Sequence, residues 1–223
     1  MDAKDWIPAF TSDPSRPSWE KRIGALGIER NEPIVLCDDG SNKDAAGVRA
    51  ILRYWGFTDV RLLDGGWHAW LFAGGQRDAK APHPTPRAVK LDPTAGEFIA
   101  KEQVLEMLRS GSVQVVDACT TVAADPSADL QAAVKNTDNS CLKRLTWVSI
   151  VAGRRSLKFS AKELEQLVRN AGIDVSRPTV VCSESLENAA GVAFALELIG
   201  ARNVQICFPA WYPAAEPSLA AGN

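Results

Sequence analysis

Histidine is nearly absent from this sequence. The 223 residues contain two histidines and five cysteines, and no two cysteines form a C-x-x-C pair. This scarcity argues against a histidine-rich metal cage, a structural zinc site and any mechanism that needs several imidazoles. The chemistry that stays open depends on a single thiol, on carboxylates or on backbone amides. We therefore expect neither a bound metal nor a cofactor.

A surplus of charge and long apolar runs are also lacking. The 25 basic and 27 acidic side chains give a net charge of -2, which offers no basic surface for nucleic acid. No apolar run approaches the ~18 residues that span a bilayer, and residues 1–20 contain no apolar stretch typical of a signal peptide. These absences predict a cytoplasmic protein with reduced thiols and with neither a membrane nor a nucleic-acid partner.

The sequence contains an internal repeat. Residues 27–70 and 172–214 share a Gly-Ile pair, a proline four residues before a cysteine, an Ala-Ala-Gly motif, an apolar run closed by glycine, and a tryptophan. The offset between the copies is 145 residues as far as the cysteines and 144 residues after them. This many coincidences imply two copies of one structural unit.

Each copy has the pattern of a strand, a loop, a helix and a second strand. The predicted strands cover residues 34–37, 59–63, 179–182 and 203–207, and the predicted helices cover residues 45–55 and 189–199. This order is typical of a βαβ unit, in which ligands lie beyond the carboxyl ends of the parallel strands. We therefore predict an α/β fold whose functional loops follow Cys37 and Cys182.

The copies suggest two domains of unequal completeness. We assign residues 1–80 to a shortened N-terminal domain, residues 81–97 to a proline-rich linker and residues 98–223 to a C-terminal domain. The second domain also contains predicted helices at 99–110 and 160–170, a strand at 113–117 and an irregular stretch at 120–158. Nothing before Trp19 matches the strand at 113–117. The first sheet then has an uncovered edge, which predicts either a homodimer through this domain or further residues upstream.

The residues 63–70, Leu-Asp-Gly-Gly-Trp-His-Ala-Trp, resemble the closing signature of rhodanese domains. The two copies together resemble the tandem thiosulfate and mercaptopyruvate sulfurtransferases. The resemblance implies two rhodanese-like domains, each a parallel sheet flanked by helices, with the N-terminal one incomplete. Within the signature we expect Asp64 to Trp67 to shape a turn. We expect Trp147, elsewhere in the chain, to pack in the core.

In that family the second domain carries a catalytic cysteine at a strand end, and this cysteine opens a six-residue loop. Carried over by resemblance, the catalytic residue is Cys182, and the substrate-binding loop is Ser183, Glu184, Ser185, Leu186 and Glu187. The family's first domain usually has an aspartate at the equivalent position, which favours Asp38 as the counterpart of Cys182. The other placement of the offset pairs Cys37 with Cys182.

The resemblance implies a sulfurtransferase. Such an enzyme moves a sulfane sulfur from a small anionic donor, of the thiosulfate or mercaptopyruvate type, to a thiol or cyanide acceptor through a Cys182 persulfide. The loop departs from the family, because Glu184 and Glu187 are acidic and Cys119 stands where an arginine is usual. Carboxylates raise the pKa of a nearby thiol and repel an anionic donor. These departures favour the alternative of a catalytically inactive rhodanese-like binding or regulatory module.

Overall fold

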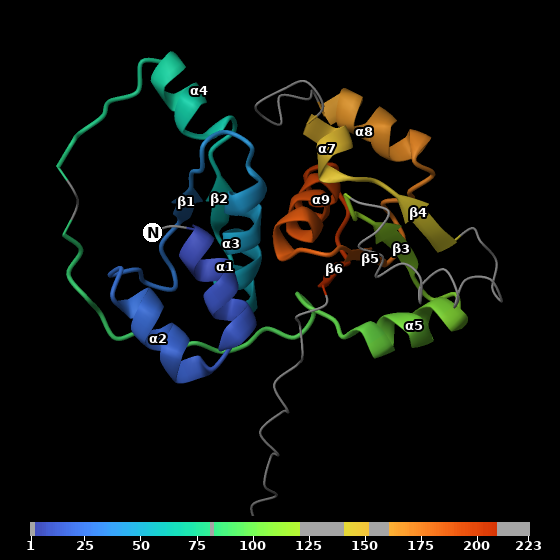
Figure 1. The fold of residues 1–223 in the computed structure, drawn as a ribbon, viewed down its shortest axis with the longest axis horizontal. Helices are drawn as coiled ribbons and strands as arrows, with labels where there is room; N and C mark the ends of the chain where they lie inside the picture. The colour runs from blue at the N-terminus through green and yellow to red at the C-terminus, as the bar shows by residue number, and fades with distance from the viewer. Residues whose placement is uncertain (1–2, 81–82, 121–140, 152–160, 209–223) are drawn as a thin grey trace, which may run out of the picture.

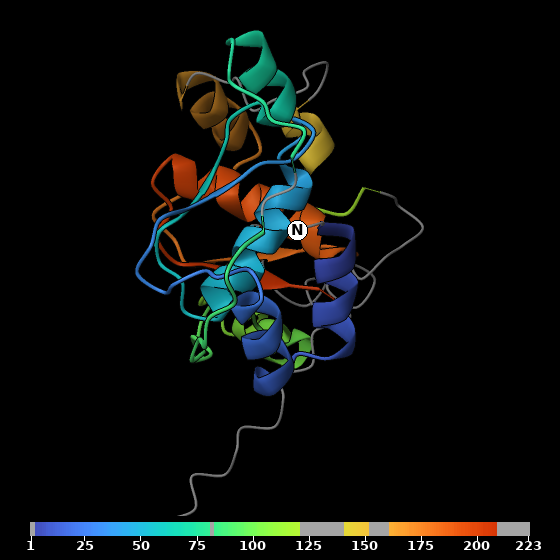
Figure 2. The same ribbon diagram turned by 90° about the vertical axis from the view of Figure 1, so that its left-hand side faces the viewer.

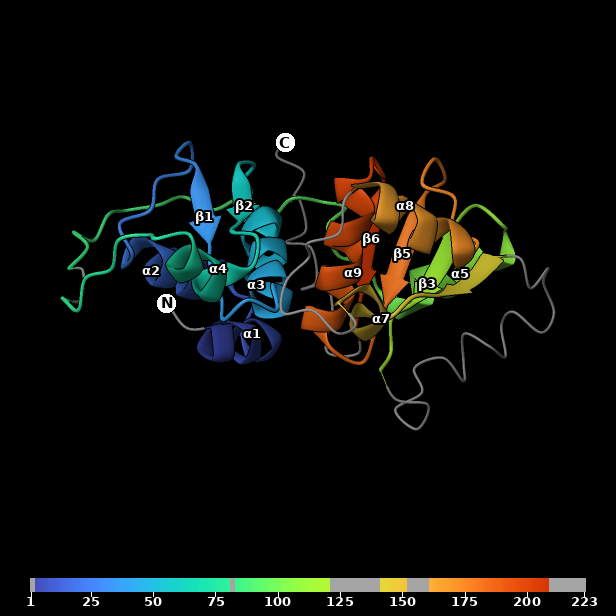
Figure 3. The same cartoon turned by 90° about the horizontal axis from the view of Figure 1, so that it is seen from above.

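The computed structural model describes residues 3–80, 83–120, 141–151 and 161–208. It contains two α/β units side by side (Figures 1 and 3). The N-terminal unit comprises α1 (Ala3–Ser12), α2 (Arg16–Gly24), β1 (Ile34–Leu36), α3 (Lys43–Tyr54), β2 (Val60–Leu62) and α4 (Gly66–Phe72). The C-terminal unit comprises α5 (Lys101–Arg109), β3 (Gln114–Asp117), β4 (Leu142–Arg144), α7 (Trp147–Val151), α8 (Ala161–Asn170), β5 (Thr179–Cys182), α9 (Leu186–Leu198) and β6 (Val204–Cys207). The predicted α/β class with two units is confirmed.

The larger sheet belongs to the C-terminal unit. Its strands are all parallel, in the order β4-β3-β5-β6, and every residue of β3 and β5 is buried. Side chains alternate between two clusters, so that Val180 packs with α5 and Val181 packs with α9. Burial on both faces explains why these strands read as continuous apolar runs in the sequence.

The N-terminal sheet consists of β1 and β2 alone among the described residues. The predicted incompleteness of this domain is therefore confirmed. What the sequence did not predict is that helix α1 lies before Trp19 and contributes to the core. Trp6 and Phe10 of α1 are buried, and their rings meet the Trp19 ring edge-on at centroid distances of 5.1 and 5.4 Å. Aromatic packing thus stabilises the part of the unit that lacks further strands.

The stretch at 120–158, predicted as irregular, contains regular structure in its described part. Strand β4 pairs in parallel with β3, and helix α7 follows it with Trp147 and Ile150 buried. The prediction failed because β4 has only three residues and none of them is fully buried, so it shows no apolar run. The expected helix start at residue 160 lies outside the described residues.

The two equivalent helices begin earlier than their apolar patterns indicate. Helix α3 starts at Lys43 and α9 at Leu186, where the sequence predicted residues 45 and 189. In α9 the backbone N–H of Asn188 donates to the Ser185 side chain, which caps the helix. The described parts of the chain contain no helix that is both long and apolar enough to cross a membrane.

The proline-rich segment lies along the N-terminal unit rather than away from it (Figures 1 and 2). The Arg87 N–H donates to the Gly24 carbonyl, the Leu91 N–H to a Glu20 carboxylate oxygen, and the Thr94 N–H to the Tyr54 carbonyl. Leu91 is fully buried. These contacts hold the segment against α2 and α3, so it connects the units by a fixed route.

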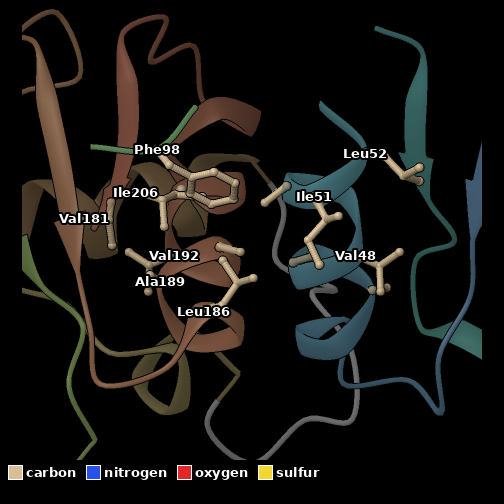
Figure 4. Close-up of a cluster of buried hydrophobic side chains, with 14 of the residues drawn as sticks. Val48, Ile51, Leu52, Phe98, Val181, Leu186, Ala189, Val192 and Ile206 are labelled. Atoms are coloured by element: carbon tan, nitrogen blue, oxygen red, sulfur yellow. The ribbon is translucent and has the colours of Figure 1, made fainter. Parts of the chain in front are cut away.

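Helices α3 and α9 form the contact between the units. They are the equivalent helices of the two repeats, and their apolar faces join both units into one hydrophobic core. In Figure 4, Leu186 lies on the side of α9 that faces α3, whereas Val192 lies beside Val181 on the side that faces β5. Ile51 of α3 is fully buried in the shared core. At the rim, Arg49 contacts Glu197 at 2.7 Å. The units are therefore held together mainly by apolar packing, with charged pairs at its edge.

We predict that Ile51→Ala destabilises the protein by about 2–5 kcal/mol, because it leaves a cavity in the shared core. Urea unfolding would measure the loss. The matched control is Phe72→Ala, since the Phe72 side chain is 94% exposed and its removal should change the free energy of unfolding very little. Equal effects of the two substitutions would contradict a shared core at α3 and α9.

Candidate functional site

The carboxyl end of β5 holds the predicted nucleophile. Cys182 is the last residue of the strand and lies in register between Asp117 of β3 and Cys207 of β6. Its side chain is 3% exposed and belongs to the apolar cluster beneath α5. The thiol is therefore inside the core of the unit, on the sheet face opposite α9.

The surroundings of Cys182 disfavour its thiolate. A hydrogen bond with the Cys207 thiol raises the pKa of Cys182 well above its ordinary value, and burial raises it further. Negative charge on Asp117 acts in the same direction. Because the thiolate is the nucleophilic form, these contacts lower the reactivity of Cys182 in this arrangement.

Residues 183–188, here named the second strand-end loop, connect β5 to the first turn of α9. Ser183 is buried, and its N–H donates to the Cys207 carbonyl at 3.1 Å. Leu186 is 2% exposed and enters the core between the units. Glu187 lies against Gly47 of α3. Of the five residues predicted to bind substrate, only Glu184, Ser185 and Glu187 are partly exposed.

Glu184 is the most strongly bonded member of this loop. Its carboxylate accepts hydrogen bonds from the Thr120 backbone and hydroxyl, from the Ser183 hydroxyl at 2.9 Å and from the Asn188 side-chain amide at 2.9 Å. Burial alone would raise the pKa of Glu184, but the hydrogen bonds from Thr120 and Ser183 outweigh it and lower the pKa to about 2. A fixed carboxylate therefore stands beside the end of β5.

Arg144, at this same end of the sheet, was not predicted. Arg144 of β4 donates to the Asp117 carboxylate at 2.7 Å and to the Cys119 carbonyl at 3.0 Å. It supplies a cation beside Asp117, although Cys119 stands where the family usually has arginine. Burial and a hydrogen bond with Asp117 raise the pKa of the Cys119 thiol. The only hint of Arg144 in the sequence is that residues 142–144, Leu-Lys-Arg, end in two basic side chains.

The equivalent loop of the N-terminal unit, residues 38–45 and here named the first strand-end loop, also holds a carboxylate. Asp38 accepts hydrogen bonds from the backbone N–H groups of Gly40 at 2.9 Å, Asn42 at 3.1 Å and Ala45 at 3.4 Å. Successive N–H groups that converge on one point form an anion site. Here the chain's own side chain fills that site.

The strand registers determine which residues of the two loops are equivalent. Ile34 pairs with Val60, and Thr179 pairs with Val204, so β1 and β5 superpose at an offset of 145 residues. Cys37 is then the counterpart of Cys182, and Asp38 is the counterpart of Ser183. This overturns the preferred match of Asp38 with Cys182, which the one-residue shift between the copies had left open. Cys182 stays a prediction as nucleophile, and Ser183 takes the position that Asp38 has in its own loop.

The glycines of the signature at 63–70 shape a turn, as predicted. Gly65 and Gly66 have φ values of +73° and +55°, which favour glycine. A Cβ atom on Gly66 would lie 2.5 Å from the Asp38 carbonyl, and the Trp67 N–H donates to that same oxygen. The turn at Gly65 and Gly66 therefore packs against the backbone of the first strand-end loop and holds it through the hydrogen bond from Trp67 to Asp38.

The described part of the chain contains no group of three His, Cys, Asp or Glu side chains that could bind a metal ion. All five cysteines are free thiols, and only Cys37 is exposed. The chemistry available at the strand ends thus consists of thiols, carboxylates and backbone amides. Two parallel sheets joined through equivalent helices, with a carboxylate-containing loop at the carboxyl end of each, define a tandem α/β protein.

Comparison with known proteins specifies the class. Residues 6–73 match the family model of the rhodanese-like domain. The chain is 25% identical over 205 residues to a putative thiosulfate sulfurtransferase of Saccharopolyspora erythraea, covering 88% of this chain and 72% of that protein. It is 25% identical over 207 residues to the thiosulfate sulfurtransferase of Cricetulus griseus, with coverages of 89% and 68%.

Among solved structures, SseA of Escherichia coli, a 3-mercaptopyruvate sulfotransferase with the rhodanese fold, aligns with a TM-score of 0.71 at 21% identity. The alignment covers 88% of this chain and 73% of that one, and it shows a shared fold. Residues 6–73 are therefore similar to a rhodanese-like domain, and the chain shares the two-domain rhodanese fold of SseA, in agreement with the resemblance of residues 63–70. Its curated relatives include thiosulfate and 3-mercaptopyruvate sulfurtransferases and a sulfur carrier protein of Thermus thermophilus.

We predict that Glu184→Gln destabilises the protein in a pH-dependent way. Because the folded-state pKa of about 2 lies below the ordinary value of 4.5, the carboxylate stabilises the fold above pH 4.5 and loses this effect as the pH falls toward 2. The difference in unfolding free energy between wild type and variant, measured by urea unfolding, should shrink over that interval. The control is Glu165→Gln, at an exposed position of α8; the same trend there would contradict the role of Glu184.

Proposed function

We propose that this chain is a binding or regulatory module with the tandem rhodanese fold, and that it does not transfer sulfane sulfur. One observation carries the proposal: a carboxylate of the chain occupies each strand-end loop. Asp38 accepts three backbone N–H groups in the first loop, and Glu184 accepts four hydrogen bonds from Thr120, Ser183 and Asn188 in the second.

The charge of these loops supports the proposal. An anionic donor would have to displace a carboxylate that is already hydrogen-bonded, and like charges close together repel. The only thiol at the end of β5 is Cys182, which is 3% exposed and points into the apolar cluster under α5. Ser183, the counterpart of Asp38, carries a hydroxyl that donates to Glu184. Cys37, which directly precedes the first loop, is exposed, but partial burial and the charge of Asp38 raise the pKa of its thiol. Neither loop therefore presents a thiolate to a donor.

Sulfur transfer through Cys182 is the second candidate, and the names of the relatives favour it. The Cys182 thiolate would attack the outer sulfur of a thiosulfate-type donor, forming a persulfide as the donor's sulfur–sulfur bond breaks and sulfite leaves. A thiol or cyanide would then take the outer sulfur and return the thiolate. This route requires the packing of α5 against the sheet to open, because Cys182 is buried in the cluster under that helix.

We predict that wild-type protein shows no thiosulfate:cyanide or mercaptopyruvate turnover and gains no sulfur atom by intact mass spectrometry. Cys182→Ser and Cys37→Ser should leave both results unchanged. Wild-type turnover that Cys182→Ser abolishes and Cys37→Ser retains would overturn the proposal and establish sulfur transfer.

A further inference from the structure

Two thiols of the C-terminal unit lie next to each other, and the proposed function uses neither. Cys182 of β5 and Cys207 of β6 are paired residues in the parallel ladder, each the last residue of its strand. Both side chains belong to the same buried cluster under α5, so they project from the same face of the sheet. The two sulfur atoms are therefore neighbours across one strand spacing.

The two thiols differ in pKa and in exposure to solvent. The Cys182 thiol donates a hydrogen bond to the Cys207 sulfur, and this bond lowers the pKa of Cys207 while it raises that of Cys182. Burial and the charge of Glu102 raise the pKa of Cys207 in part, whereas the charge of Lys101 at the start of α5 lowers it further. Cys207 is also the more exposed of the two, at 7% against 3%. Cys207 thus has the greater thiolate character and the better access to solvent.

We propose that Cys182 and Cys207 form a redox-active dithiol that a hydroperoxide closes to a disulfide. The Cys207 thiolate attacks one peroxide oxygen; a sulfur–oxygen bond forms, the oxygen–oxygen bond breaks, and the leaving oxygen takes a proton. The Cys182 sulfur then attacks the sulfenic sulfur, a sulfur–sulfur bond forms, and the oxygen leaves as water with the proton of Cys182. Two thiols are oxidised, and one hydroperoxide is reduced to an alcohol and one water, or to two waters if it is hydrogen peroxide.

The ladder geometry permits this bond. Neighbouring strands lie about 4.7–4.9 Å apart, and disulfides form between Cα atoms about 4.4–6.8 Å apart. Both cysteines end their strands, so a small adjustment of the following residues does not break the ladder. The Ser183 N–H donates to the Cys207 carbonyl, and the disulfide would therefore fix the start of the second strand-end loop against β6.

A third buried thiol, Cys119, is the competing partner. It lies close enough for its charge to affect Cys182, but burial and a hydrogen bond with Asp117 raise its own pKa. A protonated Cys119 is a poor nucleophile. Cys141 shares the buried cluster but precedes β4, at the opposite edge of the sheet from β6. The order of the strands thus selects Cys207 as the partner of Cys182.

The test uses the folded full chain, treated with hydrogen peroxide and then with an alkylating agent. We expect intact mass spectrometry to show the loss of two hydrogen atoms per chain. Trypsin, which cleaves after Arg202 between the two cysteines, should leave a non-reduced linked pair containing Cys182 and Cys207. Dithiothreitol should reverse the link. Cys37→Ala and Cys119→Ala should both retain it.

Single substitutions test the order of the two steps. In Cys182→Ala we expect Cys207 to accumulate as a sulfenic acid that dimedone traps, whereas in Cys207→Ala Cys182 should give no such adduct. Oxidation of Cys37 without a link between Cys182 and Cys207 in the same sample would overturn the proposal, and so would a link between Cys119 and Cys182. The readout is a covalent bond rather than turnover, so its result is separate from the assay of sulfur transfer.

Discussion

The packing of α3 against α9 is the contact on which the rest of the structure depends. The two helices are equivalent elements of the repeat, and their apolar faces merge the cores of both units. A unit with a two-stranded sheet has little apolar surface of its own to bury. The N-terminal unit therefore relies on α9 as well as on its own aromatic residues, Trp6, Phe10 and Trp19, to exclude water.

The same packing positions the loops. Each helix starts directly after a strand-end loop, so the contact between α3 and α9 brings the two loops to the same edge of the molecule. Glu187 at the start of α9 lies against Gly47 of α3, and Asp44 of α3 has a pKa raised by burial and by nearby carboxylates, including those of Asp38 and Glu187. The shared edge is acidic, which is the opposite of what an anionic sulfur donor requires.

In each loop the carboxylate accepts its hydrogen bonds from groups of the chain itself. Asp38 receives backbone N–H groups of its own loop, and Glu184 receives hydrogen bonds from Ser183, Asn188 and, across the sheet, Thr120. Such bonds stabilise the charged form of a carboxylate and hold the loop in one conformation. The thiols beside this edge are separated from it by the sheet, since Cys182 and Cys207 project into the cluster under α5. The fold thus keeps its carboxylates at the loops and its buried thiols in the core.

Much of the fold follows from the sequence. The repeat, the apolar runs at 179–182 and 203–207 and the glycines at 56 and 200 predict the parallel strands and the helices between them. Helix α1 was not predicted, because nothing in the repeat corresponds to it. Strand β4 was not predicted, because a short, partly exposed strand has no apolar period. At the site, the sequence places a cysteine and an acidic loop together but does not show which face of the sheet each side chain takes.

The sequence by itself determined the two-copy α/β architecture, the resemblance to tandem rhodaneses and the acidic character of the second loop, since these follow from spacing and residue type. Only the tertiary structure decided that Ser183 is the counterpart of Asp38, because a one-residue shift between the copies is settled by strand register alone. It also decided that Cys182 is buried beside Cys207. Successive side chains of a strand point to opposite faces, and the helices packed on each face determine which side chains meet solvent.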